Sequence, residues 1–242
     1  MAKILITGAS TGIGAETARL LAPNNELFLV YNRSVDKAKA LEVELLALGA
    51  KVNLLQSDIT SEIACIELFR KIGELTDSLD VLVNNAGGLV RRQPVDGLEW
   101  QLMEEIFSLN VFSLMKISSL AVPFLRKGTN ANIVNITSIV VRHGAPTATL
   151  YGAAKGAVDT FTRGLCKELA PNIRANSVSP GVIDTPFHEK VSTPEQMDAW
   201  AEGNPLKRNG QPSHIASAIK LLIDNDFING ESIDVNGGLT IR

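Results

Sequence analysis

The sequence predicts an α/β fold, a single doubly wound domain in which a seven-stranded parallel sheet has helices on both faces. Short apolar runs rich in β-branched residues alternate with longer helical patterns along almost all of the 242 residues. Within the short runs, apolar and polar residues barely alternate, which is typical of parallel strands that are buried on both faces. The length is also in the range of one domain of this class.

The predicted elements follow one another in a regular order. Apolar, β-branched runs bounded by turn residues predict strands at residues 3–7, 26–31, 51–57, 79–83, 131–137, 173–178 and 231–235. Apolar residues spaced three and four apart predict helices at residues 12–22, 35–48, 61–77, 98–125, 151–170 and 213–222.

One segment, residues 187–208, breaks this alternation. It contains Pro194 and Pro205 and predicts two short helices without a strand. Ligands of doubly wound sheets bind beyond the carboxyl ends of the strands, and a long excursion there is typical of a lid. We therefore expect a substrate lid at residues 187–208, with a plain surface loop as the alternative.

Charge and composition limit the possible partners. The 23 basic and 26 acidic residues give a net charge of −3 and a pI near 5.7, so a general electrostatic affinity for nucleic acid is not expected. No apolar run approaches the roughly 18 residues that a membrane span needs. The chain enters a strand directly after its first residues, without the features of a signal peptide. We expect a soluble cytoplasmic protein with neither a membrane nor a nucleic-acid partner.

Cysteine and histidine residues do not indicate a metal site or a disulfide scaffold. Cys65 and Cys166 lie in predicted amphipathic helices and form no Cys-x-x-Cys pair, so we interpret both as small buried hydrophobic residues. His143, His188 and His214 are far apart and lack cysteine or carboxylate partners at the spacing of metal ligands. We interpret His188 and His214 as surface or locally hydrogen-bonded residues, and no metal is expected.

A glycine-rich turn, Thr7-Gly-Ala-Ser-Thr-Gly-Ile-Gly14, joins the first strand to the first helix. Gly8 permits a tight turn, Gly12 lets the backbone approach a pyrophosphate, and Gly14 allows the helix to pack closely on the sheet. The N–H groups and positive dipole end of the helix then favour phosphate. A flexible turn is the alternative, whereas a P-loop is excluded because no Gly-Lys-Ser/Thr follows. The predicted phosphate site also includes Ser10, Thr11 and Ile13.

The end of the second strand indicates which dinucleotide binds. An acid there accepts hydrogen bonds from the ribose 2′-OH of NAD, whereas a cation favours the 2′-phosphate of NADP. The chain has Asn32, Arg33 and Ser34 at this place, and Asp36 falls inside the next helix. Arg33 is suited to charge-assisted hydrogen bonds with a phosphate. We expect NADP(H) to be preferred, with NAD(H) possible if Arg33 is only a solvated surface charge.

Four polar residues form a candidate catalytic set. Tyr151 and Lys155 are four residues apart at the start of a predicted helix, which places both side chains on one face. Ser138 follows the strand at residues 131–137, on the ligand side of the sheet. Asn110 lies inside the helix at residues 98–125, where a polar amide that faces the core requires a reason. The spacing of Tyr151 and Lys155 is a weak signal alone.

With these residues the chain resembles the short-chain dehydrogenase/reductase family in its compact form. The glycine turn matches the glycine motif of that family, and Asn84-Asn-Ala-Gly87 matches its Asn-Asn-Ala-Gly motif after the fourth strand. Pro180-Gly181 with Thr185 matches the motif after the sixth strand. The catalytic tetrad of the family is matched in order and spacing by Asn110, Ser138, Tyr151 and Lys155. The similarity covers essentially the whole chain and implies one Rossmann-type domain over residues 1–242.

The resemblance implies hydride transfer between a nicotinamide and a substrate carbon. Tyr151 would be the general acid in reduction and the base in oxidation, with its anion favoured by the charge of Lys155 and by the oxidised nicotinamide. Lys155 would also hold the nicotinamide ribose. Ser138 would orient the substrate oxygen, and Asn110 would hold a water that relays the proton through Lys155.

Further cofactor contacts are implied by the resemblance. Asp58 and Ile59 would bind the adenine, and Ile183 and Thr185 would meet the carboxamide and the phosphates. For Asn84, capping of neighbouring backbone is the alternative to a cofactor contact. NADP-preferring members often carry a basic residue before the second glycine, where this chain has Thr11. The complete implied set adds Ala86, Gly87, Tyr151, Lys155, Pro180 and Gly181.

The substrate pocket is expected to be mainly apolar, so that the substrate offers a carbon skeleton beside its carbonyl. Its walls would come from residues 88–90 and 139–141 and from Phe187, Met197 and Trp200. His143 is either a substrate contact or a loop histidine. Arg91 and Arg92 are either a site for an anionic substrate or an acyl carrier protein, or a solvated rim.

The leading hypothesis is an NADP(H)-dependent oxidoreductase acting on a secondary alcohol or ketone, such as a 3-oxoacyl-thioester-type reductase or a similar carbonyl reductase. An NAD(P)-dependent sugar or polyol dehydrogenase is the alternative, since His188, Glu189 and Gln196 of the lid could bind hydroxyls. A dinucleotide sensor without turnover is remote, because it has no use for a complete tetrad. The resemblance also implies a homo-oligomer, a dimer or tetramer, formed through the helices at residues 98–125 and 151–170.

Overall fold

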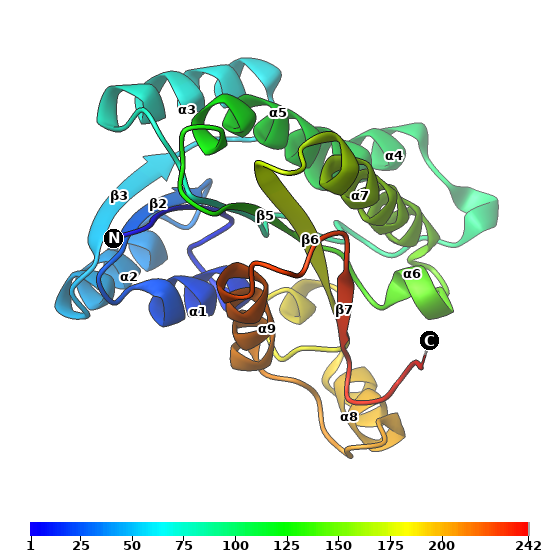
Figure 1. Ribbon diagram of the computed structural model, residues 1–242. Coiled ribbons are helices and arrows are strands. Elements are labelled where there is room, and N and C mark those ends of the chain that lie inside the picture. Colours follow the sequence, from blue (N-terminus) through cyan, green and yellow to red (C-terminus); the bar gives the residue numbers. More distant parts are fainter. Residues whose placement is uncertain (242) are drawn as a thin grey trace.

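In the computed structural model, which describes residues 1–241, the chain forms one parallel sheet with the strand order β3-β2-β1-β4-β5-β6-β7. Helices cover both faces of the sheet (Figure 1), so the predicted fold class is confirmed. The strands are β1 Lys3–Thr7, β2 Glu26–Tyr31, β3 Lys51–Gln56, β4 Val81–Asn84, β5 Ala131–Ile136, β6 Ile173–Pro180 and β7 Ser232–Val235.

The helices fall into long covering elements and short turns. The α-helices are α1 Gly12–Leu21, α2 Val35–Ala47, α3 Glu62–Leu75, α4 Trp100–Phe107, α5 Ser113–Leu125, α6 Val140–His143, α7 Thr149–Glu168, α8 Pro194–Gly203 and α9 Pro212–Asp224. Two 3₁₀ turns are η1 Val95–Gly97 and η3 His188–Lys190, and a π-helical turn is η2 Ser108–Phe112.

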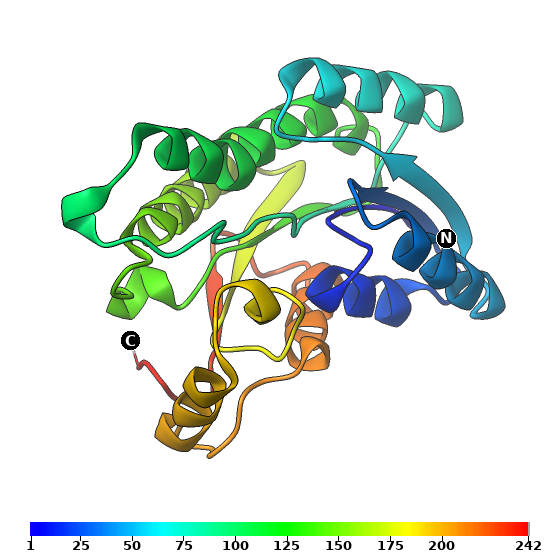
Figure 2. The same cartoon turned by 180° about the vertical axis from the view of Figure 1, so that it is seen from behind.

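Apolar residues on both sides of the central strands explain the two helical layers. In β1, Ile4 and Ile6 pack with the layer of α1, α2 and α9, whereas Leu5 packs with the layer of α3, α5 and α7. Figure 2 shows the same two layers from behind, with the sheet between them. A strand that is apolar at successive positions suits a sheet covered on both faces.

The strand order reverses at β1, whose neighbours are β2 on one side and β4 on the other. The chain segments that leave the carboxyl ends of β1 and β4 therefore diverge to different parts of the fold. In open α/β sheets the crevice between such segments is where ligands bind. The fold places the candidate site here.

The predicted elements are confirmed to within two residues at each end, except that the helix expected at residues 98–125 is divided. It consists of α4, the π-helical turn η2 and α5, in one continuous run. Asn110 lies in η2, and its side-chain Nδ2 donates a hydrogen bond to the carbonyl oxygen of Ile106 at 2.8 Å. This side-chain bond competes with the regular backbone ladder and accompanies the wider turn.

The same run corrects one sequence expectation. The stretch Trp100–Leu125 is long and apolar enough to cross a membrane by length and composition alone, contrary to the prediction that no segment approaches a span. That prediction counted uninterrupted apolar residues, whereas this stretch, which includes serines and Lys116, contains an 18-residue window with a mean hydropathy of 1.4. Core helices have the same composition, and here Ile117, Ala121 and Leu125 are buried in the core beneath the sheet.

Residues 187–208 contain η3 and α8 and no strand, as predicted. A capping box begins α8, in which Thr193 Oγ1 accepts a hydrogen bond from the Gln196 N–H and Gln196 Oε1 accepts one from the Thr193 N–H. Pro194 occupies the first turn, where its fixed φ and missing N–H do no harm. Local sequence therefore suffices to explain where this helix begins.

Arg174 of β6 ties the sheet to the end of α9. Its guanidinium donates to the carbonyl oxygens of Leu222 at 2.9 Å, Ile223 at 3.2 Å and Ile228 at 2.9 Å. Arg174 is buried, and the last carbonyl groups of a helix lack partners within the helix. The cation also complements the negative end of the helix dipole.

We predict that Arg174→Met lowers the free energy of unfolding by about 2–4 kcal/mol, because buried carbonyl groups lose a charged donor. Arg126→Met, at an exposed arginine that follows α5, is the control and should change it by less than about 0.5 kcal/mol. Urea unfolding at one protein concentration measures both variants. Equal stability of the two variants would contradict this role of Arg174.

Candidate active site

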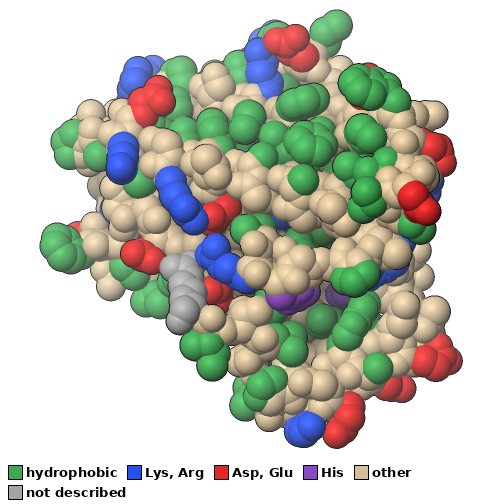
Figure 3. Space-filling view, turned by 90° about the vertical axis from the view of Figure 1, so that its right-hand side faces the viewer, with side chains coloured by type: hydrophobic (Ala, Val, Ile, Leu, Met, Phe, Trp, Pro, Cys, Tyr) green, Lys and Arg blue, Asp and Glu red, His purple; other side chains and the backbone are tan. Residues whose placement is uncertain are grey.

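A cavity of about 970 Å³ lies at the carboxyl ends of the strands. Its walls come from the turn after β1, from the segments after β2, β4, β5 and β6, and from α7 and α8. Figure 3 shows a hollow in this side of the molecule, in which histidine side chains are visible above the lower lobe. The cavity gathers residues that are far apart in the sequence, from Gly8 to Leu239.

The turn between β1 and α1 forms one end of the cavity. Gly8 and Gly12 have φ angles of +64° and +55°, in the left-handed region that favours glycine. A Cβ atom on Gly14 would lie 2.4 Å from the Gly8 carbonyl oxygen, so glycine is required there for close packing. The Thr11 side chain makes no capping hydrogen bond, and the first turn of α1 has no acid. The open N–H groups and positive dipole end therefore fit the pyrophosphate of a dinucleotide.

Side-chain hydrogen bonds join this turn to the segment after β4. Asn85 Nδ2 donates to the carbonyl oxygens of Thr7 and Gly8, both at 3.0 Å. Thr7 Oγ1 accepts hydrogen bonds from the N–H groups of Asn85 and Ala86, both at 3.1 Å. Ala86 and Gly87 are thereby held beside the glycine turn, where both line the cavity. Asn85 lines it too, although the sequence prediction named only its neighbour Asn84.

Asn84 points into the interior and does not line the cavity. Its Nδ2 donates to Ser118 Oγ and to Asn135 Oδ1, both at 2.9 Å, and the residue is 2% exposed. The partners of this side chain are therefore other side chains of the fold, whereas the two roles considered above were a cofactor contact and the capping of neighbouring backbone. Three further predicted cofactor residues also lie outside the cavity wall, namely Gly14, Asp58 and Ile59.

At the end of β2, Asn32, Arg33 and Ser34 line the cavity next to the glycine turn. Asp58, the acidic residue among the predicted cofactor contacts, does not line the cavity. Its Oδ1 accepts hydrogen bonds from the hydroxyl and the N–H of Thr60 at 2.7 and 3.1 Å. The bond from the Thr60 hydroxyl is the main cause that lowers the pKa of Asp58, and the charge of Arg33 adds to it. The cavity wall at this end carries a cation and no acid.

Tyr151, Lys155 and Ser138 converge on the wall between α7 and the end of β5. Lys155 Nζ lies 5.7 Å from the centroid of the Tyr151 ring, which confirms that their spacing places them on one face of α7. The same Nζ donates a hydrogen bond to the Ile136 carbonyl oxygen at 2.8 Å. The Ser138 hydroxyl interacts with the Tyr151 hydroxyl and lowers its pKa, but burial has the larger effect.

Burial moves the pKa values of the two titratable groups in opposite directions. It raises the pKa of Tyr151 to about 12 and lowers the pKa of Lys155 to about 8. Tyr151 is therefore a protonated phenol at neutral pH, the form that a general acid requires. The raised pKa of Tyr151 reflects burial and the opposing bond from Ser138, and the effect expected of Lys155 and the oxidised nicotinamide on the tyrosine anion stays a prediction.

Asn110 is fully buried, and its hydrogen bonds explain why a polar amide faces the core at this position. Its Nδ2 donates to the carbonyl oxygens of Ile106 and Gly88, both at 2.8 Å, and its Oδ1 accepts from the Gly88 N–H at 3.0 Å. A Cβ atom on Gly87 would lie 2.7 Å from Asn110 Oδ1 and 3.1 Å from Lys155 Nζ. Glycine at position 87 thus leaves Asn110 and Lys155 close together with no side chain between them.

Aromatic rings wall the cavity on the far side of Tyr151. The ring centroids of Tyr151 and Phe187 are 6.1 Å apart, those of Phe187 and His188 are 5.0 Å apart, and those of His188 and Trp200 are 5.8 Å apart. His188 is thus part of the wall, whereas His214 accepts a hydrogen bond from the Gln211 N–H, as expected of a local group. Of the residues predicted for the pocket, the cavity is lined by Leu89, Ile139, Val140, Phe187 and Trp200 but not by Gly88, Val90, Val141 or Met197.

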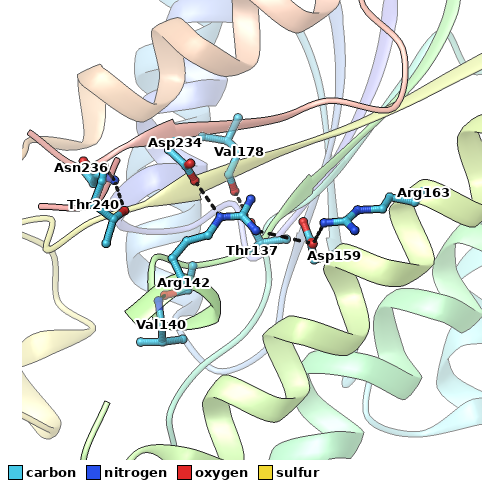
Figure 4. A network of polar contacts seen from close by, with 10 residues as sticks. Thr137, Val140, Arg142, Asp159, Arg163, Val178, Asp234, Asn236 and Thr240 are labelled. Carbon is cyan, nitrogen blue, oxygen red and sulfur yellow. Dashed lines mark hydrogen bonds and ion pairs between the residues drawn. The ribbon is translucent and has the colours of Figure 1, made fainter. Parts of the chain in front are cut away.

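The segment after Ser138 is anchored by charged groups, shown in Figure 4. Arg142 of α6 lies 3.9 Å from an Asp159 carboxylate oxygen of α7 and 3.6 Å from an Asp234 carboxylate oxygen of β7. Arg163 also pairs with Asp159, at 2.5 Å. These contacts hold α6 between α7 and β7 and so restrain the loop that carries Ser138.

Among residues 1–241, no group of three or more His, Cys, Asp or Glu is placed to hold a metal ion. Both cysteines are free. Cys65 is buried, as predicted, and burial raises the pKa of its thiol to about 11. Cys166 is half-buried. Its Sγ donates a hydrogen bond to the Arg163 carbonyl oxygen.

Known sequences match the chain over nearly its whole length. A family model described as enoyl-(acyl carrier protein) reductase matches residues 8–240. The chain is 35% identical to the uncharacterized oxidoreductase YgfF of Escherichia coli (strain K12), over 98% of this chain and 100% of the relative. It is 33% identical to the 3-oxoacyl-[acyl-carrier-protein] reductase FabG of Thermotoga maritima, over 98% of this chain and 97% of the relative.

Solved structures share the fold along the same length. A short-chain dehydrogenase/reductase of Brucella melitensis has a TM-score of 0.91 at 31% identity, covering 100% of this chain and 97% of its own. A short-chain dehydrogenase of Burkholderia cenocepacia in complex with NADP has a TM-score of 0.89 at 28% identity, covering 98% and 97%. The NADH-dependent reductase A1-R' responsible for alginate metabolism has a TM-score of 0.88 at 30% identity, covering 100% and 98%. The chain therefore belongs to the short-chain dehydrogenase/reductase family.

Proposed function

We propose that the protein is an NADP(H)-dependent oxidoreductase that transfers a hydride between the nicotinamide and a secondary alcohol or ketone, as a 3-oxoacyl-thioester-type reductase or a similar carbonyl reductase. Family membership makes it an oxidoreductase acting on CH–OH and C=O groups. The proposal rests on one observation. Tyr151, Lys155 and Ser138 line the same cavity as the open N-terminus of α1.

Tyr151 is the group that exchanges a proton with the substrate oxygen. Reduction of a ketone requires a proton and a hydride, and the bound nicotinamide supplies the hydride. With its pKa raised to about 12 by burial, Tyr151 holds a proton at neutral pH and donates it as charge develops on the substrate oxygen. Ser138, beside the Tyr151 hydroxyl, orients that oxygen.

Lys155 stabilises the phenolate that Tyr151 leaves behind and holds the nicotinamide ribose. Its ammonium, 5.7 Å from the Tyr151 ring centroid, is the positive charge nearest to this group in α7. Asn110 supports a water that returns the proton through Lys155. The closeness of Asn110 and Lys155 across Gly87 supports this relay. Both residues also keep structural hydrogen bonds, to Gly88 and to Ile136.

The residues of the wall fit a dinucleotide. The α1 N-terminus would hold the pyrophosphate, and Arg33 at the end of β2 would hold the 2′-phosphate of NADP. One structure of similar fold is a complex with NADP and another is named an NADH-dependent reductase, so NAD(H) is the alternative cofactor. The predicted cofactor residues that line the cavity are Gly8, Ser10, Thr11, Gly12, Ile13, Asn32, Arg33, Ser34, Ala86, Gly87, Tyr151, Lys155, Pro180, Gly181, Ile183 and Thr185.

An NAD(P)-dependent sugar or polyol dehydrogenase is the second candidate. Two polar lid residues named for this alternative, His188 and Gln196, line the cavity, whereas Glu189 does not. Polar groups on a cavity wall suit substrate hydroxyls. A dinucleotide sensor is less suitable, because a sensor does not need a tyrosine and a lysine placed beside each other.

We also propose that residues 187–208 close over the substrate as a lid of this single domain and that the protein is a cytoplasmic homo-oligomer, a dimer or tetramer. The proposal of a lid is supported by Phe187 and Trp200, two residues of this segment that form part of the cavity wall. The side chains of Trp100 and Phe112, in α4 and η2, are 73% and 59% exposed, which supports an interface on this helical layer. Gel filtration of the purified protein tests the assembly.

Arg33→Ala is expected to weaken NADPH binding at least tenfold, about 1.4 kcal/mol, because only NADPH carries the 2′-phosphate. NADH binding should not change. Lys37→Ala, at an exposed lysine of α2 outside the cavity wall, is the control and should leave both affinities as they are. Energy transfer from protein to nicotinamide during titration measures both affinities for the wild type and for each variant. A wild-type protein that binds NADH as tightly as NADPH would overturn the cofactor preference.

Tyr151→Phe should lower turnover of a ketone by about 10²–10⁴-fold, because the general acid is lost, and should keep NADPH affinity. A panel of ketones reduced with NADPH, followed by the absorbance of the nicotinamide, gives the rates. Wild-type protein that binds NADPH but reduces no member of a broad panel would favour the sensor. A variant that keeps most of its turnover would remove Tyr151 from its assigned role.

Lys155 should also affect stability at alkaline pH. The unfolded chain keeps the ordinary lysine pKa of 10.5 while the folded protein has about 8, so the unfolded state binds more protons between these values. Stability relative to Lys155→Met should therefore rise by about 2–3 kcal/mol as the pH goes from 8 to 10. Taking the difference between the two proteins removes the contributions that other titrating groups, such as Cys65, make to the pH dependence of stability. Urea unfolding at each pH measures it, and a constant difference would contradict the lowered pKa.

A further inference from the structure

We propose that Arg92 binds a carboxylate of the substrate, so that the protein interconverts oxo acids and hydroxy acids. This inference rests on the proposed function and narrows its substrate class. Arg92 follows β4 by eight residues, lines the cavity on the same side as Trp200, and is half-buried. Among the described residues that line the cavity, the Lys and Arg side chains are Arg92, Lys155 beside Tyr151, and Arg33 beside the glycine turn.

The guanidinium of Arg92 is held in a fixed orientation. Its Nε donates a hydrogen bond to the Val191 carbonyl oxygen at 2.8 Å, and its Cζ lies 5.7 Å from the centroid of the Trp200 ring. These contacts use Nε and one face of the guanidinium, which leaves the edge formed by the two Nη atoms. That edge presents two parallel N–H donors, the geometry that matches both oxygens of a carboxylate.

Arg92 differs from its neighbour Arg91 in having no ion-pair partner among the described residues. Arg91 forms a two-point ion pair with Glu99 at 2.8 and 3.3 Å and does not line the cavity. Of the ion pairs among the described residues, none includes Arg92. The half-buried guanidinium of Arg92 keeps its contacts with Trp200 and Val191 without an ion-pair partner, and a countercharge that reaches it gains a charge-assisted hydrogen bond. A substrate carboxylate supplies that countercharge.

The backbone around Arg92 is unusual in a way that supports a functional role. Val90 and Thr147 both have φ of +64°, a left-handed conformation that is rare for β-branched residues. The Gln93 N–H donates to the Thr147 carbonyl oxygen at 2.8 Å, so the two strained segments are joined next to Arg92. Strain of this kind persists where surrounding structure enforces it, and it concentrates at ligand sites. Here the strained backbone lies beside two neighbouring arginines with different surroundings: Arg92 lines the cavity, whereas Arg91 pairs with Glu99 outside it.

Among the described residues, no carboxylate lines the cavity. Burial, and then the charge of Arg92, lower the pKa of His188 against the opposing charge of Asp184, so the His188 ring is neutral at neutral pH. Its Nδ1 is hydrogen-bonded with Ser192 Oγ at 2.9 Å. The line of ring contacts from Tyr151 through Phe187 and His188 leads to Trp200, on which Arg92 lies. A substrate along this line has its carbonyl at Tyr151, an apolar skeleton beside the rings and its carboxylate at Arg92.

The carboxylate takes no part in the chemical step. The ketone carbon receives the hydride of NADPH and the ketone oxygen receives the proton of Tyr151, which yields a hydroxy acid and NADP⁺. Arg92 is therefore a residue that determines specificity rather than a catalytic residue. Its rival role is purely structural, since the bond to Val191 ties the segment after β4 to the lid. Matched substrates separate the two roles.

The experiment compares straight-chain oxo acids of increasing length with their methyl esters, which differ mainly in charge. Initial rates with NADPH give kcat/KM for wild-type protein, Arg92→Met and the control Arg91→Met. We expect the best oxo acid to exceed its ester by about 10–100-fold in the wild type, as one charge-assisted bidentate contact allows. Arg92→Met should remove this advantage by lowering kcat/KM for the acid far more than for the ester, and Arg91→Met should preserve the advantage.

Equal kcat/KM for acid and ester in the wild type would overturn the carboxylate site. An equal loss for both substrates in Arg92→Met would also overturn it and identify a lid contact alone. If the wild type reduces no acid or ester with NADPH or NADH, the proposed function fails instead. Calorimetric titration of the same oxo acids into wild type and Arg92→Met, with NADP⁺ present, then decides separately: weaker binding by the variant supports the site, and identical titrations overturn it.

Discussion

The hydrogen bonds between Thr7 and Asn85 are the constraint on which the cavity depends. At the place where the strand order reverses, β1 and β4 end side by side, and Thr7 and Asn85 lie at these two ends. The two side chains satisfy four backbone groups here, and a buried backbone group without a partner would cost free energy. Because the protein satisfies them internally, the glycine turn and the Ala86–Gly87 segment can present bare backbone to a ligand.

Tyr151 and Lys155, the proposed catalytic groups, are buried where the fold disfavours their charged forms. The sheet interior that positions Lys155 also lowers its pKa, and the same burial raises that of Tyr151. The Ile136 carbonyl oxygen offers a dipole to the ammonium but no countercharge. A bound ligand that excludes water and carries its own charges would stabilise the charged forms of these two groups more than the empty cavity does. The proton on Tyr151 and the charge on Lys155 are therefore properties of the protein that the ligand modifies rather than creates.

The order of elements, the fold class and the general place of the site could be predicted because each has a local signal in the sequence. Aliphatic runs mark the strands, and the glycines that end at Gly14 mark a turn that other residues cannot form. Neighbouring residues could not be told apart, because strand ends decide which of them faces inward. Asn84 and Asn85 differ in this way, and so do Arg91 and Arg92. The π-helical turn could not be predicted from its neighbours alone, since the Asn110 amide also binds the carbonyl and N–H of Gly88, which lie 22 residues earlier.

The π-helical turn acts as a change of phase along the longest helical run. Each residue of an α-helix advances its side chain by about 100°, so one extra residue in a wide turn rotates everything after it by about that angle. The apolar stripe of α4 and that of α5 therefore need not lie on one straight line. Accordingly α4 packs on α7 while α5 packs on β4 and β5. The two helices of this continuous run therefore present their apolar faces in different directions. Each face can pack on its own neighbours, α7 for α4 and the sheet for α5.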